Sequence, residues 1–134
     1  MIVVDTSAIV AIFKVEADAQ QLAQAIERDP APVMSAASVM ECSIVIRAAK
    51  LLADAEAEVW LDEMLGRARI DVRPVTAEQL VIARAAHVRF GKGTGHPAQL
   101  NFGDCFAYAL AKAMDVPLLY KGDDFARTDI RSAL

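Results

Sequence analysis

The chain opens with Met1-Ile-Val-Val-Asp5-Thr6-Ser7, and this stretch decides which fold we expect. The apolar run before Asp5 predicts a short strand that is buried on both faces, as the strands of a parallel sheet are. Asp5 would then lie at the carboxyl end of a central strand, where the loops of an open α/β sheet leave a ligand-binding crevice. Thr6 or Ser7 can cap the helix that follows, and Asp5 has a plainer alternative role as a helix N-cap.

Strand and helix patterns alternate along the rest of the chain. Short apolar runs predict strands, and amphipathic stretches with capping residues predict helices. The expected strands are 33–34, 70–73 and 118–120, with a short edge strand at 128–130, and the expected later helices are 15–28, 36–50, 54–65, 77–90 and 102–114. This alternation predicts an α/β fold in which helices cover both faces of a short, mainly parallel sheet.

Size and composition indicate one globular domain over residues 1–134, with 55% hydrophobic residues. The apolar runs are shorter than the roughly 20 residues of a membrane helix, and no basic region precedes the first one, so we expect neither a membrane span nor a signal peptide. Cys42 and Cys105 fit no disulfide framework and no CxxC metal site. We therefore expect two buried thiols and a reducing, cytoplasmic compartment.

Acidic residues occupy four places in the sequence where a functional role is a reasonable alternative to an ordinary solvent-exposed position. Asp5 and the pair Asp123-Asp124 follow predicted strands, Glu41 lies in an almost wholly apolar helix, and Asp104 is the third residue of a predicted helix. An unpartnered buried carboxylate is costly, so Glu41 needs a partner, either an arginine or a metal ion. Asp104 also has an ordinary alternative role, since an acid is favourable near a helix N-terminus.

A parallel sheet would bring these carboxylates together, because three of the four places lie at its carboxyl edge. Clustered carboxylates stay ionised only beside positive charge, and oxygen ligands alone indicate a hard cation, Mg²⁺ or Mn²⁺. Such a site suits phosphodiester hydrolysis. A bound cation also weakens the objection that a net charge of −4 opposes a nucleic-acid ligand. No Walker A loop, GxSxG elbow, HExxH or dinucleotide fingerprint is present.

Four motifs together resemble the PIN-domain ribonucleases, and more narrowly the VapC toxins of bacterial toxin–antitoxin modules. They are Val3-Val-Asp-Thr-Ser7, Ser35-Ala-Ala-Ser-Val-Met-Glu41, Leu100-Asn-Phe-Gly-Asp-Cys-Phe-Ala-Tyr-Ala-Leu-Ala111 and Leu118-Leu-Tyr-Lys-Gly-Asp-Asp-Phe-Ala-Arg-Thr-Asp-Ile130. The match runs essentially end to end. It implies a three-layer α/β/α domain, an Mg²⁺-dependent endoribonuclease, a homodimer and a VapB-like antitoxin that covers the acidic pocket.

The resemblance also implies roles for individual residues. Asp5 and Asp104 would be the principal metal ligands, Glu41 would complete the pocket, and Thr6 or Ser7 would hydrogen-bond a carboxylate or water. Many PIN domains place the fourth acid in a Thr-x-Asn or Thr-x-Asp turn, whereas this chain has Tyr-Lys-Gly-Asp-Asp at 120–124. Of the two acids we favour Asp123 as the fourth catalytic and metal-binding residue, and we expect Asp124 to cap the turn that follows.

A glycine-rich segment at 91–103 predicts a long loop, and such loops are usually functional or mobile. Basic residues gather before it and within it, among them Arg84, Arg89, Lys92 and His96. They are either an incidental charged surface or a set that holds RNA phosphates beside the metal site.

Two other functions are weighed against the nuclease. A PIN-like interaction module that no longer cuts would have little use for all four acids. A haloacid-dehalogenase-like phosphatase with Asp5 as nucleophile would need another acid two residues later, where Ser7 stands. The sequence does not encode which RNA is cut, because RNA is recognised largely through shape and loops.

Overall fold

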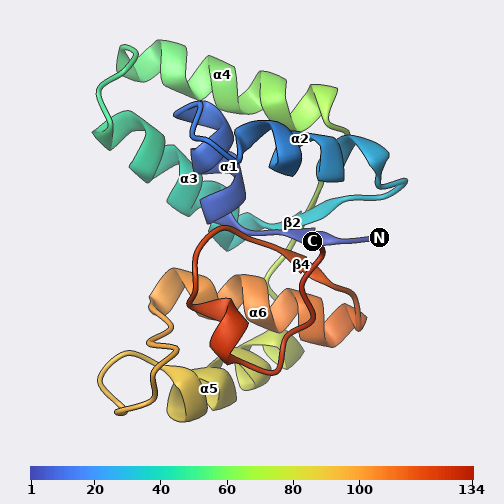
Figure 1. Ribbon diagram of the computed structural model, residues 1–134, viewed down its shortest axis with the longest axis vertical. Helices are drawn as coiled ribbons and strands as arrows, with labels where there is room; N and C mark the ends of the chain where they lie inside the picture. The colour runs from blue at the N-terminus through green and yellow to red at the C-terminus, as the bar shows by residue number, and fades with distance from the viewer.

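A computed structural model describes residues 1–134 and has one sheet at its centre (Figure 1). Its strands are β1 (Val3–Val4), β2 (Val33–Ser35), β3 (Asp71–Arg73) and β4 (Leu118–Leu119). They are ordered β3-β2-β1-β4, and every pair is parallel. The short parallel sheet predicted from the alternating pattern is therefore confirmed, with the opening strand in an inner position.

Helices cover both faces of this sheet and make three layers (Figure 1). One face carries α1 (Thr6–Phe13), α2 (Ala19–Arg28), α3 (Ala36–Ala48) and α4 (Asp54–Arg67), and the other carries α5 (Ala77–Phe90) and α6 (Phe102–Met114). Side chains alternate along a strand, so the adjacent residues Val4 and Val3 point to opposite faces of the sheet. Val4 packs in one hydrophobic core and Val3 packs in the other. Both residues are completely buried, which explains the uninterrupted apolar run.

The second helix, the fourth helix and the expected edge strand differ from the prediction, and the ends of α3 and of strands β2, β3 and β4 shift by only one or two residues. The second helix begins at Ala19 and not at 15, because Val15 adopts a left-handed conformation with φ 53° and is 82% exposed. The fourth helix continues through Gly66 to Arg67, and the left-handed residue after it is Arg69. Residues 128–130 form no edge strand. Instead, Leu118 makes an isolated parallel bridge to Ser132.

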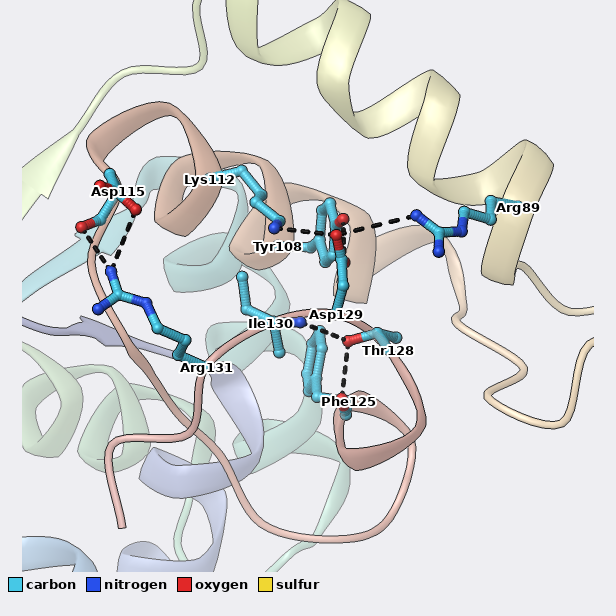
Figure 2. Close-up of polar contacts among 9 residues, drawn as sticks. All are labelled: Arg89, Tyr108, Lys112, Asp115, Phe125, Thr128, Asp129, Ile130 and Arg131. Atoms are coloured by element: carbon cyan, nitrogen blue, oxygen red, sulfur yellow. Dashed lines mark hydrogen bonds and ion pairs between the residues drawn. The ribbon is translucent and has the colours of Figure 1, made fainter.

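Side-chain contacts of Asp129 hold the segment after β4 (Figure 2). The Tyr108 hydroxyl donates to Asp129 Oδ1 at 2.5 Å, and Lys112 Nζ lies 3.0 Å from Asp129 Oδ2. Desolvation acts to raise the pKa of Asp129, but hydrogen bonds from Tyr108 and Lys112 outweigh it and lower that pKa below its ordinary value. The chain between β4 and Asp129, which includes the short 3-10 helix η1 (Phe125–Arg127), is thereby fixed against α6.

The topology decides where the acidic residues lie. Because all the strands are parallel, the carboxyl ends of the neighbouring strands β1 and β4 lie at the same edge of the sheet. The α3 helix follows β2 directly and packs against α1 and α6. No helix is long and apolar enough to cross a membrane.

Candidate metal centre

A pocket of about 260 Å³ opens at the carboxyl edge of the sheet. The charged residues in its wall are Asp5, Glu41, Asp104 and Asp124, together with one base, Lys121. The uncharged ones are Thr6, Ser7, Val10, Val45, Asn101 and Phe125. Residues far apart in the sequence thus meet in one acidic cavity, as the strand-end positions predicted.

Asp5 is the most enclosed of these acids, with 2% of its surface exposed. Its Oδ2 accepts the Ser7 backbone N–H at 2.9 Å and so caps α1. Its Oδ1 is buried without any hydrogen-bond partner, which is costly for a carboxylate. Burial, and secondarily the charge of Glu41, raises the pKa of Asp5 to about 6, although the bonds from Ser7 oppose this shift. Helix capping therefore accounts for one oxygen of Asp5 and leaves the other free for a ligand.

Asp104, at the start of α6, also caps a helix and lines the pocket. It forms a reciprocal capping box, in which its backbone N–H donates to Asn101 Oδ1 at 2.9 Å and its Oδ2 accepts the Asn101 N–H at 3.0 Å. It is 8% exposed. Burial raises its pKa to about 7, against the bond from Asn101, and the charges of Asp5, Asp124 and Glu41 add to the rise. The capping box orients the carboxylate, and the neighbouring negative charges favour a cation beside it.

Glu41 differs from the prediction of an enclosed carboxylate, because it is only partly buried. Its neighbours Met40 and Ile44 are exposed, so α3 presents part of its apolar surface to solvent. Glu41 makes no ion pair with an arginine, and that alternative for its partner is not realised. Its carboxylate lies directly over Gly103, where an added Cβ would be 1.9 Å from Glu41 Oε2.

Gly103 is therefore a site residue that the sequence reasoning missed. Its signal was a glycine in the first turn of a predicted helix, since glycine is a poorer helix former than alanine. The absent side chain leaves room for Glu41 to approach α6.

We predict that Gly103→Ala displaces the Glu41 carboxylate and weakens the binding of a divalent cation in the pocket about tenfold or more, as loss of a residue supporting a metal site does. Titration with Mn²⁺ measures the affinity, and circular dichroism shows whether the variant is folded. The matched control is Gly66→Ala in α4, where an added Cβ meets nothing within 4 Å. That variant should keep full affinity and gain a little stability. Equal affinity of the two variants would show that Glu41 has no fixed place in the pocket.

The fourth acid in the pocket wall is Asp124, and Asp123 is not among the lining residues. The preference for Asp123 as the residue nearer the strand end is thus not supported by its position. Gly122, with φ +99°, turns the chain after β4, so sequence distance from the strand does not decide which side chain faces the pocket. The expected cap is also wrong, because Asp124 makes no side-chain hydrogen bond to the start of η1.

The two hydroxyl residues after Asp5 have different contacts. The Thr6 hydroxyl donates to the Ser38 backbone carbonyl at 3.1 Å and ties α1 to α3. Ser7 Oγ accepts the Lys121 backbone N–H at 2.9 Å and ties α1 to the loop after β4. Thr6 therefore acts on the scaffold, whereas Ser7 bonds both Asp5 and the opposite wall of the pocket.

The donor set fits a hard divalent cation that keeps much of its water. No three His, Cys, Asp or Glu side chains form a group that encloses an ion as they stand. Mg²⁺ does not require such a cage, since it commonly takes one or two carboxylates and several waters. The unpartnered Asp5 Oδ1, the raised pKa values of Asp5 and Asp104, and a pocket wall without arginine all favour a positive ligand here. Cys42 and Cys105 are buried free thiols, as predicted.

None of the four basic residues of the glycine-rich region lines the acidic pocket. Arg89 pairs with Asp129 at 3.8 Å, and its guanidinium lies 4.5 Å from the centroid of the Phe90 ring. His96 Nδ1 accepts a backbone N–H at 3.0 Å, and its ring meets Phe90 edge-on. These two residues have roles within the fold.

Arg84 and Lys92 are exposed. Arg84 lines a separate, mostly apolar pocket on α5 and α6, whose lining includes none of the acids. A role for either residue in RNA binding stays a prediction. The one basic side chain in the acidic pocket is Lys121, which the sequence reasoning did not single out.

Comparison with known proteins places this geometry in a family. The PIN domain family model matches residues 2–131. The chain is 47% identical over 132 residues to VapC ribonuclease Mb0625 of Mycobacterium bovis, which covers 98% of this chain and 97% of that protein. It is 46% identical over 132 residues to ribonuclease VapC42 of Mycobacterium tuberculosis, covering 98% of each.

Solved structures agree on the fold. VapC20 of M. tuberculosis, described as a toxin that cleaves the sarcin–ricin loop, superposes with a TM-score of 0.77 at 17% identity over 97% of this chain and 96% of that one. VapBC2 of Rickettsia felis, solved with a fragment of promoter DNA, gives a TM-score of 0.70 at 16% identity over 98% and 96%. The chain belongs to the PIN-domain family and, within it, to the VapC ribonucleases.

Proposed function

We propose that this protein is an endoribonuclease toxin that hydrolyses RNA phosphodiester bonds with a divalent metal ion, Mg²⁺ or Mn²⁺. The observation that carries the proposal is the buried Asp5 carboxylate, whose Oδ1 lacks a partner in a pocket shared with Asp104, Glu41 and Asp124. The names of the relatives support the reaction class, since they are ribonucleases at 46–47% identity.

Each acid has a distinct part in the proposed site. Asp5 and Asp104 hold the ion, because they are the two buried carboxylates and hydrogen bonds from backbone N–H groups set their orientation. Glu41 completes the site from α3, and Asp124 takes the fourth place for which Asp123 was favoured. A divalent ion bound there neutralises phosphate charge and makes water a better nucleophile near neutral pH.

The chain's own residues explain how a phosphodiester could be held and attacked. The backbone N–H groups of Ser7 and Asn101 donate to the Asp5 and Asp104 carboxylates and fix their orientation in the pocket wall. Glu41 is partly buried and Asp124 is exposed, so these two stand at the solvent side of the cavity. They are the acids that we assign to accept a proton from the attacking water.

The proposal extends to partners. The Rickettsia felis VapBC2 structure and a Klebsiella pneumoniae toxin–antitoxin complex, with a TM-score of 0.67, support a VapB-like antitoxin as the neutralising partner. We also propose a homodimer that acts in the cytoplasm, where its RNA substrate and a reducing environment for Cys42 and Cys105 are found.

Cleavage of a structured RNA tests the function. We expect cleavage with Mg²⁺, its loss on chelation and its return when Mg²⁺ is restored. Asp124→Asn and Asp123→Asn form a matched pair that differs only in pocket lining. The first should lower the cleavage rate at least about tenfold and the second should leave it nearly unchanged. Cleavage that persists in chelator would contradict the proposal of a metal-dependent nuclease.

A further inference from the structure

Lys121 is the only basic side chain in a pocket wall that also carries four acids. An RNA strand entering this pocket meets carboxylates of its own sign, and a single divalent ion offsets only two of those charges. A cation supplied by the protein at the pocket wall would meet the phosphate backbone directly. Lys121 is therefore the candidate in this pocket wall for an RNA phosphate contact.

The backbone of Lys121 is fixed relative to the metal-binding acid. Its N–H donates to Ser7 Oγ at 2.9 Å, and the Ser7 N–H donates to Asp5 Oδ2 at 2.9 Å. Two consecutive hydrogen bonds thus connect residue 121 to Asp5, across the neighbouring strands β1 and β4.

The ammonium group of Lys121 is held in place by two acids from the connection between α1 and α2. It contacts the carboxylate of Glu16 closely and lies 3.2 Å from Asp18 Oδ1. The hydrogen bond to Glu16 is the main cause that raises the pKa of Lys121, so the group is charged at neutral pH. An ammonium has three N–H donors, and two carboxylates leave one of them for a further acceptor.

Stability alone does not explain this pairing. The side chains are 32–37% exposed, and ion pairs that solvent reaches contribute little to stability. What the two acids do provide is a restricted position for a long, flexible side chain. Restricting such a side chain before binding reduces the entropy lost when it contacts a ligand.

We propose, building on the nuclease function above, that Lys121 positions the substrate by contacting a backbone phosphate of RNA at the mouth of the acidic pocket. In the free protein, Glu16 and Asp18 restrict the position of the ammonium of this pocket-lining residue. Lys121 is thus a phosphate-binding residue that acts beside the metal ion and is not one of its ligands.

Binding of a fluorescently labelled single-stranded RNA tests this role by anisotropy across a range of salt concentrations. Mg²⁺ is present, and all proteins carry Asp104→Asn so that binding is measured without turnover. Lys121→Gln should weaken binding several-fold and reduce the slope of log affinity against log salt by about one, as expected for one lost phosphate contact. Lys121→Arg should restore the slope. Lys121→Met replaces the glutamine variant if that one unfolds.

Two controls separate phosphate binding from a structural role. Lys50→Gln removes another ion-paired lysine, which pairs with Asp54 at 3.5 Å outside the pocket, and should leave affinity and slope unchanged. Glu16→Gln removes the ion pair of Glu16 with Lys121 but keeps the lysine charge, so the slope of log affinity against log salt should persist. The proposal is overturned if Lys121→Gln has the slope of Lys50→Gln, or if Glu16→Gln loses as much slope as Lys121→Gln.

The cleavage assay on the unmodified chain is run alongside, so the two proposals fail separately. If the unmodified chain cleaves RNA but Lys121→Gln leaves the salt dependence of binding unchanged, the phosphate contact of Lys121 is contradicted and the nuclease function stands. If binding depends on Lys121 but the unmodified chain never cleaves RNA, the nuclease function is contradicted and the phosphate contact stands.

Discussion

Asp5→Asn is expected to reduce RNA cleavage by more than about a hundredfold while the protein remains folded. Loss of a residue that merely supports a metal ligand costs about 10–100-fold, and Asp5 is proposed as a ligand itself. Asparagine retains the oxygen that caps α1 and is as good an N-cap as aspartate, so the Ser7 N–H keeps its acceptor. Only the negative charge, with its unpartnered Oδ1, is changed.

Single-turnover cleavage rates measure this effect, with circular dichroism as the test of folding. Asp71→Asn is the matched control, since Asp71 is an exposed acid that pairs with Arg73 on β3 and lies outside the pocket. It should cleave at the unmodified rate. Equal cleavage by the unmodified, Asp5→Asn and Asp71→Asn proteins would point to a contaminating nuclease and would remove Asp5 from the site.

The second large effect is a pH-dependent instability of the metal-free chain. The pKa of Asp104 rises from 3.8 to about 7 on folding, mainly because the group is buried. Between these two pH values the folded state binds more protons than the unfolded state, so the free energy of unfolding falls as pH rises. A shift of this size, about three pH units at about 1.4 kcal/mol per unit, corresponds to a loss on the order of 4 kcal/mol by pH 8. Asp5, with a pKa of about 6, adds a loss of the same sign.

Urea unfolding in chelator at pH 5 and pH 8 isolates this contribution when the unmodified chain is compared with Asp104→Asn. Asparagine keeps the capping geometry but does not titrate, so its stability advantage over the unmodified chain should grow with pH. Mg²⁺ should reduce the difference at pH 8, because a ligand that binds only the folded state stabilises it. A difference independent of pH would show that Asp104 is an ordinary ionised surface acid.

The contribution of Asp129 to stability changes with pH in the opposite direction to that of Asp104. Its pKa is lowered in the folded protein by hydrogen bonds from Tyr108 and Lys112, although desolvation opposes the shift. A lowered pKa contributes stability above the unfolded value of 3.8, and that contribution disappears as pH falls. The acids of the pocket and the acid that holds the tail therefore respond to pH in opposite directions.

Simple local rules located the two buried acids of the site. Asp5 follows an apolar run that predicts a buried strand, and Asp104 stands at the third position of a capped helix. Parallel topology then brings the ends of β1 and β4 to one edge. The fold class and these two positions follow from short-range patterns, because strand ends and helix starts have residue-specific signals.

The remaining parts of the pocket depend on contacts between segments that no local pattern encodes. Whether Asp123 or Asp124 lines the cavity is decided by the turn at Gly122 and by the attachment of the tail through Asp129. The exposure of Glu41 depends on how α3 packs against α1 and α6, and its approach requires Gly103. An apolar composition alone suggested a deeper position for Glu41 than it has.

The central claim is that the acids of this pocket bind a hard divalent cation through Asp5. Titration of Mn²⁺, followed by electron paramagnetic resonance, tests it most directly because the signal of free hydrated Mn²⁺ is lost on binding. We predict saturable binding by the unmodified chain, competition by Mg²⁺, and loss of that binding in Asp5→Asn but not in Asp71→Asn. Equal Mn²⁺ binding by the unmodified and Asp5→Asn proteins would contradict it.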